Sequence, residues 1–294
     1  MSMGIVISSI AAVTGSGSSI EQAARAAKQA IASAGCGPEQ IDALINVGVY
    51  RDSNMVEPAM SALIQQQVGI GLEYGSGDVP CLSFDLMNGA CGVLNAVQVS
   101  QALLESAAVQ RVLIVSGDAH PSASAEPVPG FPITPVGAAL ILEKAEGSVG
   151  FGSLHIGATE ELPAKVGFVK LREMGGTGRS TVVVDRTDTT VDVLLKHAVE
   201  SALSAVEVDD IDITRTVLVC GRPTPDFPEL LAERLGLPAD ALCADSTDGD
   251  AHTSALPVAY LTARDTGQLD GQQAVLFVAA GAGPTAAAIT YRLR

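Results

Sequence analysis

Two ten-residue stretches, DLMNGACGVL at residues 85–94 and TDGDAHTSAL at residues 247–256, decide the fold, because they occupy the same place in two halves of the chain. In each, small and polar residues separate a strand-like segment from an apolar segment typical of a helix. The alignment sets NGAC (88–91) against GDAH (249–252). Cys91 and His252 are therefore expected at equivalent positions, each at the start of a helix.

The segments around these stretches repeat in the same order. Helices are expected at 21–35, 57–69 and 92–107 in the first half, and at 191–205, 225–236 and 255–267 in the second. Strands are expected at the N-terminus and at 43–49, 81–86, 111–119, 137–144, 216–221, 273–283 and 285–293. Continuous apolar strands separated by helices are typical of a parallel sheet covered on both faces. The repeat divides the chain into halves 1–148 and 149–294.

Composition restricts the class of protein. The chain has 294 residues, 47% of them hydrophobic, with no Trp and 3% aromatic residues, so its core is built from Ala, Val, Leu and Ile. Abundant Gly and Ala suit close packing of helices on sheets in an α/β protein. The formal net charge is −16 and no basic run offsets it, so the surface repels nucleic acid and anionic membranes. No partner of either kind is expected.

Cysteine usage and hydropathy indicate the compartment. The five cysteines, at 36, 81, 91, 220 and 243, include no CxxC pair, which predicts free thiols, no disulfide and no metal site. No stretch reaches the length of a transmembrane helix, and the apolar N-terminus lacks the basic residues of a signal peptide. A cytoplasmic protein is expected.

Cys91 has two interpretations. Free cysteine is among the most buried residue types, so it can be an inert core residue. It can also be a nucleophile, because packing the halves about a pseudo-twofold axis would bring Cys91 and His252 together. The imidazole would then accept the thiol proton, and the helix dipole would favour the thiolate. The repeat favours a nucleophile, and Cys220, at a strand end next to this site, is the next candidate thiol.

The same stretches resemble a known family. FDLMNGACGVLNAVQVSQALLESAAVQRVLIVSGDA (84–119) is similar to the segment around the active cysteine of ketoacyl-ACP synthase III, a condensing enzyme of the thiolase superfamily. DAHTSALPVAYLTARDTGQLDGQQAVLFVAAGAG (250–283) is similar to that family's Asn-Thr-Ser motif, helix and glycine-rich loop. The resemblance covers the chain from about residue 4 onward and is weak between 120 and 185.

The resemblance implies a fold and a set of partners. The fold would be thiolase-like α/β, with two duplicated βαβαβαββ halves related by pseudo-twofold symmetry in five layers, α-β-α-β-α. The substrate would be an acyl thioester of coenzyme A or of a phosphopantetheine carrier, with no further cofactor. The superfamily is usually dimeric through paired edge strands, which implies a homodimer or a heterodimer with a homologous synthase.

Three departures from the family pattern bear on the reaction. His252 stands where synthases of this type carry Asn, but other superfamily members carry His there, so it can serve as base. Gly221, in VCGRPTP (219–225), stands where the family has a histidine that helps bind the malonyl thioester, which argues against decarboxylative condensation. The neighbouring Arg222 is a candidate for binding a carboxylate or phosphate. Only AAVTGSGSS (11–19) remains of a longer entrance segment.

Two more residues take roles from the resemblance. Gly283, in the glycine-rich loop, is an expected oxyanion donor together with the backbone N–H of Cys91, and two such donors would stabilise a tetrahedral intermediate. An ordinary turn between two strands is the alternative. Glu57 lies where the family's helix start reaches a partner's acyl tunnel, so its carboxylate is a candidate base across a dimer interface. The alternative is a helix N-terminal glutamate favoured by the helix dipole.

Two functions are therefore considered. The first is an acyltransferase or condensing enzyme in fatty-acid, polyketide or secondary metabolism, in which Cys91 forms an acyl thioester and passes the acyl group to a second substrate. The second is a catalytically degenerate subunit that pairs with an active synthase. The missing histidine and the short N-terminal half favour the second function, and the retained Cys91 and His252 favour the first.

Overall fold

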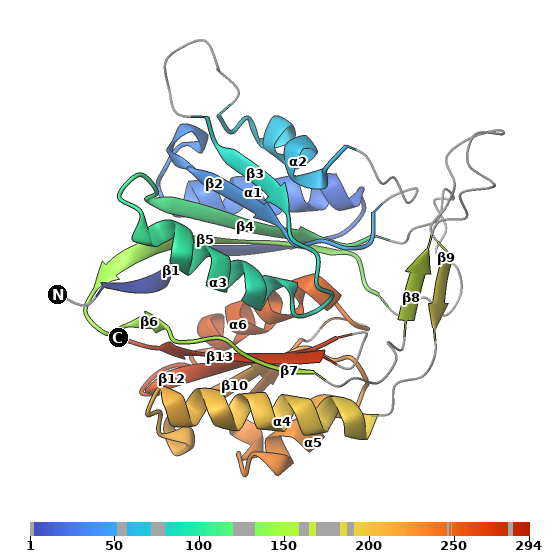
Figure 1. Ribbon diagram of the computed structural model, residues 1–294, viewed down its shortest axis with the longest axis vertical. Coiled ribbons are helices and arrows are strands. Elements are labelled where there is room, and N and C mark those ends of the chain that lie inside the picture. The colour runs from blue at the N-terminus through green and yellow to red at the C-terminus, as the bar shows by residue number, and fades with distance from the viewer. Residues whose placement is uncertain are drawn as a thin grey trace.

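Two sheets, one from each half of the chain, form the centre of the molecule (Figure 1). The computed structural model describes residues 3–51, 58–71, 80–119, 133–158, 165–168, 183–186, 191–245, 247, 249–281 and 285–294. The first sheet has the order β1-β5-β4-β2-β3, with bounds β1 (Met3–Thr14), β2 (Ala43–Asn46), β3 (Leu82–Asp85), β4 (Arg111–Gly117) and β5 (Val136–Glu146). The second has the order β11-β10-β12-β13-β6, and β7 also pairs with β13.

The strands of the second sheet are β6 (Gly150–Phe151), β7 (His155–Ala158), β10 (Thr216–Cys220), β11 (Leu242–Ala244), β12 (Ala274–Ala280) and β13 (Thr285–Arg292). A separate antiparallel pair consists of β8 (Lys165–Phe168) and β9 (Val183–Arg186). The helices are α1 (Ser19–Ser33), α2 (Met60–Val68), α3 (Gly92–Glu105), α4 (Val191–Val208), α5 (Phe227–Arg234) and α6 (Ala255–Asp265). The predicted elements are therefore present, and β6, β7, β8, β9 and β11 are additional.

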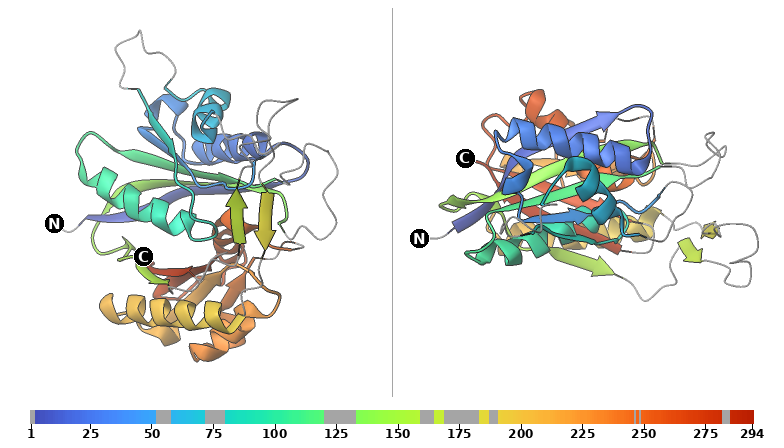
Figure 2. Two further views of the ribbon diagram at one scale, coloured as in Figure 1. Left: turned by 45° about the vertical axis from the view of Figure 1, so that its right-hand side comes forward. Right: turned by 90° about the horizontal axis from the view of Figure 1, so that it is seen from above.

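The elements stack in five layers, as the resemblance implied. α1 and α2 cover the outer face of the first sheet, α3 and α6 lie between the sheets, and α4 and α5 cover the outer face of the second (Figures 1 and 2). This arrangement places the starts of α3 and α6 side by side in the middle layer. The pseudo-twofold fold predicted from the repeat is confirmed.

The prediction of parallel sheets is wrong for one strand in each half. β5 runs antiparallel to both β1 and β4, and β13 runs antiparallel to both β12 and β7. Only four residues separate β12 from β13, and a parallel return needs a crossover of a dozen or more. The sheets are therefore mixed, and the strands that end at the candidate site, β2 with β4 and β10 with β12, are the parallel ones.

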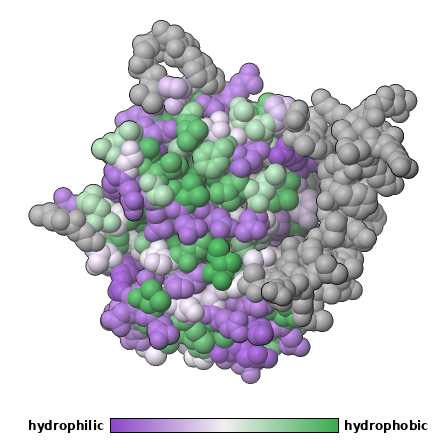
Figure 3. Space-filling view, in the orientation of Figure 1, coloured by the Kyte–Doolittle hydropathy of each residue, from purple (hydrophilic) through white to green (hydrophobic). Residues whose placement is uncertain are grey.

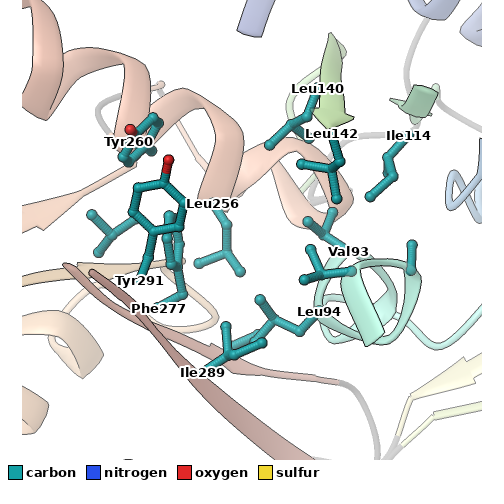
Figure 4. Packing of buried hydrophobic residues seen from close by; sticks show 14 of the residues in the cluster. Val93, Leu94, Ile114, Leu140, Leu142, Leu256, Tyr260, Phe277, Ile289 and Tyr291 are labelled. Atoms are coloured by element: carbon teal, nitrogen blue, oxygen red, sulfur yellow. The ribbon is translucent and has the colours of Figure 1, made fainter. Parts of the chain in front are cut away.

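The core between the sheets is made by α3 and α6. Apolar side chains of both helices meet the inner faces of both sheets (Figure 4), among them Val93, Leu94, Ile114, Leu140, Leu142, Leu256, Tyr260, Phe277, Ile289 and Tyr291. Each such large side chain contributes about 1.5–3 kcal/mol by burial. Because this core fixes both helices against both sheets, it also fixes where the two helix starts meet.

The N-terminal half is compact at the start of α1. Ser18 and Glu21 form a capping box at the start of α1. Only four residues separate β1 from α1, because the first residues of the segment 11–19 continue strand β1. A Cβ on Gly117 would lie 2.3 Å from the Ser19 carbonyl oxygen, and one on Gly137 would lie 2.4 Å from that of Gln22. These glycines allow α1 to contact the first sheet directly.

The described surface is mixed in polarity. On the face in Figure 3, hydrophobic residues lie in small groups separated by hydrophilic ones. Within the described residues, no helix combines the length and the apolar character needed to cross a membrane.

Candidate active site

Cys91 is enclosed by strands of the opposite half. It is the residue before α3, and it is 1% exposed. Its Sγ lies 3.7 Å from the carbonyl oxygen of Ala279 and 3.9 Å from that of Thr285. A Cβ on Gly281 would lie 4.0 Å from the same Sγ. The thiol therefore faces small residues and carbonyl oxygens from the second sheet.

Burial keeps this thiol protonated. It raises the pKa of Cys91 to about 12, from an ordinary value of 9.0. The expectation that the helix start would favour a resting thiolate is therefore wrong, since desolvation of the charged form dominates. Cys91 can act as a nucleophile only if a base removes its proton during the reaction.

His252 lies at the matching position of the second half. It begins a single 3-10 turn, His252–Ser254, that leads into α6, and its backbone has a left-handed φ of +50°. Non-glycine residues in this region are uncommon and concentrate at functional sites. A Cβ on Gly89, two residues before Cys91, would lie 3.8 Å from His252 Nε2. Nε2 therefore faces the loop that carries the thiol, as the repeat predicted.

The other ring nitrogen of His252 is held by a buried carboxylate. Its Nδ1 lies 3.0 Å from Asp118 Oδ2, and Asp118 is completely buried after β4. Among the described residues, this carboxylate also accepts from the N–H groups of Val49 (2.8 Å), Tyr50 (2.7 Å) and Thr253 (3.2 Å) and from the Thr253 hydroxyl (2.6 Å). The Tyr50 ring packs against the imidazole, with centroids 5.2 Å apart.

These contacts determine the state of the imidazole. Burial by itself would raise the pKa of Asp118, but the His252 charge and the bonds from His252, Thr253 and Tyr50 outweigh it and lower the pKa. An ionised carboxylate only accepts hydrogen bonds, so Nδ1 of His252 must donate. In the neutral imidazole Nε2 then carries the lone pair, which is the form a general base needs.

Asp118 was not identified from the sequence. It lies 134 residues from His252, and the sequence reading took it as part of a strand. A signal was present, because an aspartate directly after an apolar strand, in LIVSGDA (113–119), lies at the carboxyl edge where ligands bind in α/β proteins.

Comparisons with known proteins relate the chain to others by sequence and by fold. No family model matches the chain. An acyl-CoA:acyl-CoA alkyltransferase of Xanthomonas campestris is 28% identical over 98 residues, which are 33% of this chain and 26% of that protein. The match thus spans about a quarter of that relative's length.

Solved structures match over nearly the whole chain. A histidine-to-alanine variant of Xanthomonas campestris OleA superposes with a TM-score of 0.77 at 14% identity, covering 99% of this chain and 98% of that one. The FabH β-ketoacyl-[acyl carrier protein] synthase III of Thermus thermophilus gives 0.78 at 19% identity, covering 98% and 99%. This chain has the thiolase-like fold of condensing enzymes. The resemblance read from the sequence is confirmed at the level of the fold.

A side chain at the position of the expected histidine would meet the start of α6. Gly221 is buried directly after β10, and a Cβ there would lie 3.3 Å from the Ala255 Cβ at the start of α6. A histidine would therefore need α6 to shift. Arg222 donates from Nη1 to the Pro225 carbonyl oxygen at 2.7 Å and lies 3.8 Å from Glu229, so its guanidinium serves the loop before α5. Neither contact assigns a ligand to these two residues.

Other expected members of the site are placed differently. Cys220 packs in the outer core beneath α4 and α5, on the opposite face of the second sheet from Cys91, because side chains alternate along β10. The expectation that it lies next to the site is therefore wrong. The Cys91 N–H donates to the Asn88 carbonyl oxygen at 3.1 Å, so it is not free as an oxyanion donor. Gly283 and Glu57 lie outside the described residues.

Proposed function

We propose that this chain is an acyltransferase of the ketoacyl synthase III type. Cys91 would take an acyl group from an acyl-CoA or acyl-carrier thioester and pass it to a second substrate in fatty-acid, polyketide or secondary metabolism. The observation that carries the proposal is His252, whose Nδ1 bonds to ionised Asp118 while Nε2 faces the Cys91 loop. The name of the Xanthomonas relative, an acyl-CoA:acyl-CoA alkyltransferase, supports this substrate class.

The first half-reaction starts from a Cys91 thiol and a neutral His252 imidazole. His252 Nε2 removes the proton from Cys91 Sγ as the sulfur attacks the thioester carbonyl carbon. Asp118 stabilises the resulting imidazolium, as a carboxylate does behind other catalytic histidines. The carbon–sulfur bond of the donor breaks, and its thiolate leaves with the proton from Nε2. The products are a free thiol and an acyl-Cys91 thioester, and His252 is neutral again.

The second half-reaction passes the acyl group to an acceptor. The regenerated lone pair on Nε2 can take a proton from the acceptor as it attacks the acyl-Cys91 carbonyl carbon. The bond between the acyl carbon and Cys91 Sγ then breaks, and Nε2 returns the proton to the leaving sulfur, which restores the Cys91 thiol and the neutral imidazole. Decarboxylation of a malonyl thioester needs hydrogen-bond donors to its carbonyl oxygen, and Gly221 supplies no side chain for this role. Non-decarboxylative transfer is therefore favoured. Glu57 remains the proposed base from a partner subunit.

The degenerate-subunit alternative is disfavoured by the same contacts. A subunit without catalysis needs neither an ionised aspartate at zero exposure nor a histidine in the left-handed region. Burying a charge in this way is costly unless it is used and well paired. The retained arrangement therefore supports a reactive chain.

The assembly and compartment belong to the same proposal. We propose a dimer through β3, one of the two edge strands of the first sheet, where Leu82 at its start and Met87 just after its end are 54% and 53% exposed. Exposed edge strands with apolar side chains are sites of strand pairing between chains. All five cysteines are free, which supports a reducing, cytoplasmic environment.

The test is direct detection of the covalent intermediate. The intact protein is incubated with a series of acyl-CoA and acyl-carrier thioesters, and its mass is measured. We expect one acyl group on Cys91 with at least one donor, and none on Cys91→Ala. Cys220→Ala, which removes another buried thiol, should still acylate. Absence of an adduct with every donor, or acylation of Cys91→Ala, would contradict the proposal.

A further inference from the structure

A cavity, here called the distal cavity, lies at the end of the middle layer that is remote from Cys91. Its volume is about 540 Å³, within the range of small-molecule sites. α6 begins beside His252 and contributes Tyr260 and Arg264 to the cavity, and β13 begins beside Cys91 and contributes Tyr291 and Arg292. An 11-residue helix is about 16 Å long, so the cavity is separate from the candidate active site. The two ends of the chain lie at this same end in Figure 1.

Positive charge collects at this cavity although the chain as a whole is acidic. The chain has 17 Lys and Arg residues and a net charge of −16. Four of them line the cavity, namely Lys144, Arg264, Arg292 and Arg294. The single acidic residue in the lining, Glu143, already accepts from Arg111 Nε at 2.6 Å. The lining therefore carries a positive charge that its own carboxylate does not neutralise.

Within the described part of the chain, two of these cations bond to neutral groups only. Lys144 Nζ donates to the Ser106 carbonyl oxygen at 3.0 Å, and Arg292 donates to the carbonyl oxygens of Asp209 and Asp210. These bonds orient both side chains without removing their charge. Arg264 pairs with Asp265, but the two side chains are about half exposed, and exposed pairs are weak.

The wall of the cavity contains a β-bulge. The β1–β5 register shifts between Ile7 and Ser9, and both Ile7 and Ser8 line the cavity. Ile7 N–H donates to the Tyr291 hydroxyl at 3.3 Å. Bulges redirect groups in this way and are enriched beside functional sites.

A pair of buried phenols completes the wall. Tyr260 and Tyr291 are each 7% exposed, and their hydroxyl groups interact with each other (Figure 4). Burial raises the pKa of both phenols, so they remain hydrogen-bond donors. Their interaction takes up at most one of the two hydroxyl hydrogens, and the Tyr291 oxygen receives a further hydrogen from Ile7 N–H. No described residue accepts the second hydroxyl hydrogen, which is free to bind a ligand.

We propose that this cavity binds a small anion that carries an apolar group, such as a carboxylate or phosphate monoester with a short alkyl chain. Lys144 and Arg292, with Arg264 at the rim, would hold the anionic head. The remaining phenol hydrogen would donate to it. The apolar lining would hold the tail, and consists of Val6, Ile7, Ala145, Val149, Leu269 and Leu293. Charge-assisted bonds in a partly desolvated site are the strong ones, so the head should dominate the affinity.

Calorimetric titration tests the proposal with four probes. Octanoate and octyl phosphate carry both the head and the tail and distinguish the two kinds of anion. Octanol carries the tail alone, and inorganic phosphate carries the head alone. We expect one or both octyl anions to bind with one site per chain, and each to bind more tightly than octanol or inorganic phosphate. No binding of either octyl anion, or equally tight binding of octanol, overturns the proposal.

Variants locate the binding. Lys144→Gln combined with Arg264→Gln should weaken binding by about fivefold or more. Arg234→Gln, which removes a charge at the end of α5, is the matched control and should leave binding unchanged. Binding that these cavity variants leave unaffected, or that only His252→Ala weakens, would place the anion elsewhere and overturn the proposal.

Tyrosine fluorescence gives a second readout. The chain has four Tyr and no Trp, so the emission of Tyr260 and Tyr291 is not masked by indole. Octyl anions should change this emission, and Tyr291→Phe should remove most of the change while the protein stays folded by circular dichroism. An unchanged response in Tyr291→Phe counts against binding beside the phenols. The site is independent of Cys91 acylation, so either proposal can fail alone.

Discussion

The two halves of the molecule place the same elements around Cys91 and His252 but give these residues opposite surroundings. Asp118 is the first residue after β4, and it bonds to His252 of the other half. Gly281 is the first residue after β12, and it lies beside Cys91 of the other half. Each strand end thus reaches the helix start of the opposite half, one with a carboxylate and one with no side chain. The fold brings the strand end of each half to the helix start of the other half. The residue at that strand end, aspartate or glycine, then decides which helix start carries the base.

The largest effect is expected from removing the base of this pair. His252→Ala leaves the buried Cys91 thiol without a proton acceptor, so the rate of Cys91 acylation should fall by about 10²–10⁴-fold. Rapid-quench intact mass measures this rate with whichever donor acylates the unmodified protein. His197→Ala, at a second histidine that is buried in the described part of the chain, is the control and should retain the rate. An unchanged rate in His252→Ala would show that the two halves do not cooperate.

Asp118→Asn removes the charge behind His252. The strand end of the first half is then uncharged, as the strand end at Gly281 is in the second half. The amide has one acceptor oxygen, so it cannot accept all the hydrogen bonds that the two carboxylate oxygens of Asp118 accept. It also cannot stabilise the His252 imidazolium by charge, so acylation should slow by about tenfold or more. ¹⁵N NMR of His252 should show the proton on Nδ1 in the unmodified protein and a changed tautomer in the variant. An unchanged spectrum would mean that Asp118 only supports the fold.

Acid should act through the same carboxylate. The pKa of Asp118 is lowered on folding, so its contribution to stability is complete above the ordinary aspartate pKa of about 4 and is lost as the pH falls through the folded value. Urea unfolding of Asp118→Asn should therefore lose less stability on acidification than the unmodified chain. A parallel loss in both proteins contradicts this linkage.

Alkaline pH tests the surroundings of the other helix start. Burial raises the pKa of Cys91 from 9.0 to about 12. The rate of its alkylation by iodoacetamide should therefore keep rising about tenfold per pH unit above pH 9, whereas the alkylation rate of a free cysteine stops rising there. The folded state keeps the proton longer than the unfolded state, so this thiol stabilises fully below about pH 9 and less as the pH rises toward 12. Peptide-resolved mass spectrometry measures the rate. A plateau near neutral pH would reveal a thiolate–imidazolium pair instead.

Gly281→Ala adds a side chain where the first half has Asp118. Its methyl group would lie 4.0 Å from Cys91 Sγ and 3.6 Å from the Ala90 nitrogen, which are ordinary contacts, so the protein should fold. The space beside the acyl group becomes smaller, and acylation by bulky donors should slow by about tenfold while acetyl transfer changes less. Equal effects on short and long donors would argue against an acyl group on this side.

The smallest effect is expected at a cross-half hydrogen bond. Ser116 Oγ and Ser254 Oγ are 2.7 Å apart, and Ser254 also donates to the Val136 carbonyl oxygen at 2.8 Å. The second half has Ala279 at the position of Ser116, so Ser116→Ala makes the halves more alike. It should lower the free energy of unfolding by about 1 kcal/mol, because Ser254 keeps one partner. Urea titration measures the change, and acylation of Cys91 should be retained.

The sequence by itself determined the element order, the duplication and the equivalence of Cys91 and His252. Local apolar periodicity predicts the elements, and the repeat predicts which residues are equivalent. Both patterns are present in the linear sequence and need no knowledge of tertiary contacts. The same reasoning placed Cys220 next to the site, because it followed the strand end and not the alternation of side chains along β10.

Only the tertiary structure decided the chemistry around these two residues. Asp118 lies behind His252 because two helix starts from different halves meet in the middle layer, and burial raises the pKa of the Cys91 thiol because strands of the opposite half enclose it. The distal cavity likewise combines β1, β5, α6 and β13. Such contacts join segments more than a hundred residues apart, so they depend on how the layers pack and not on any local pattern.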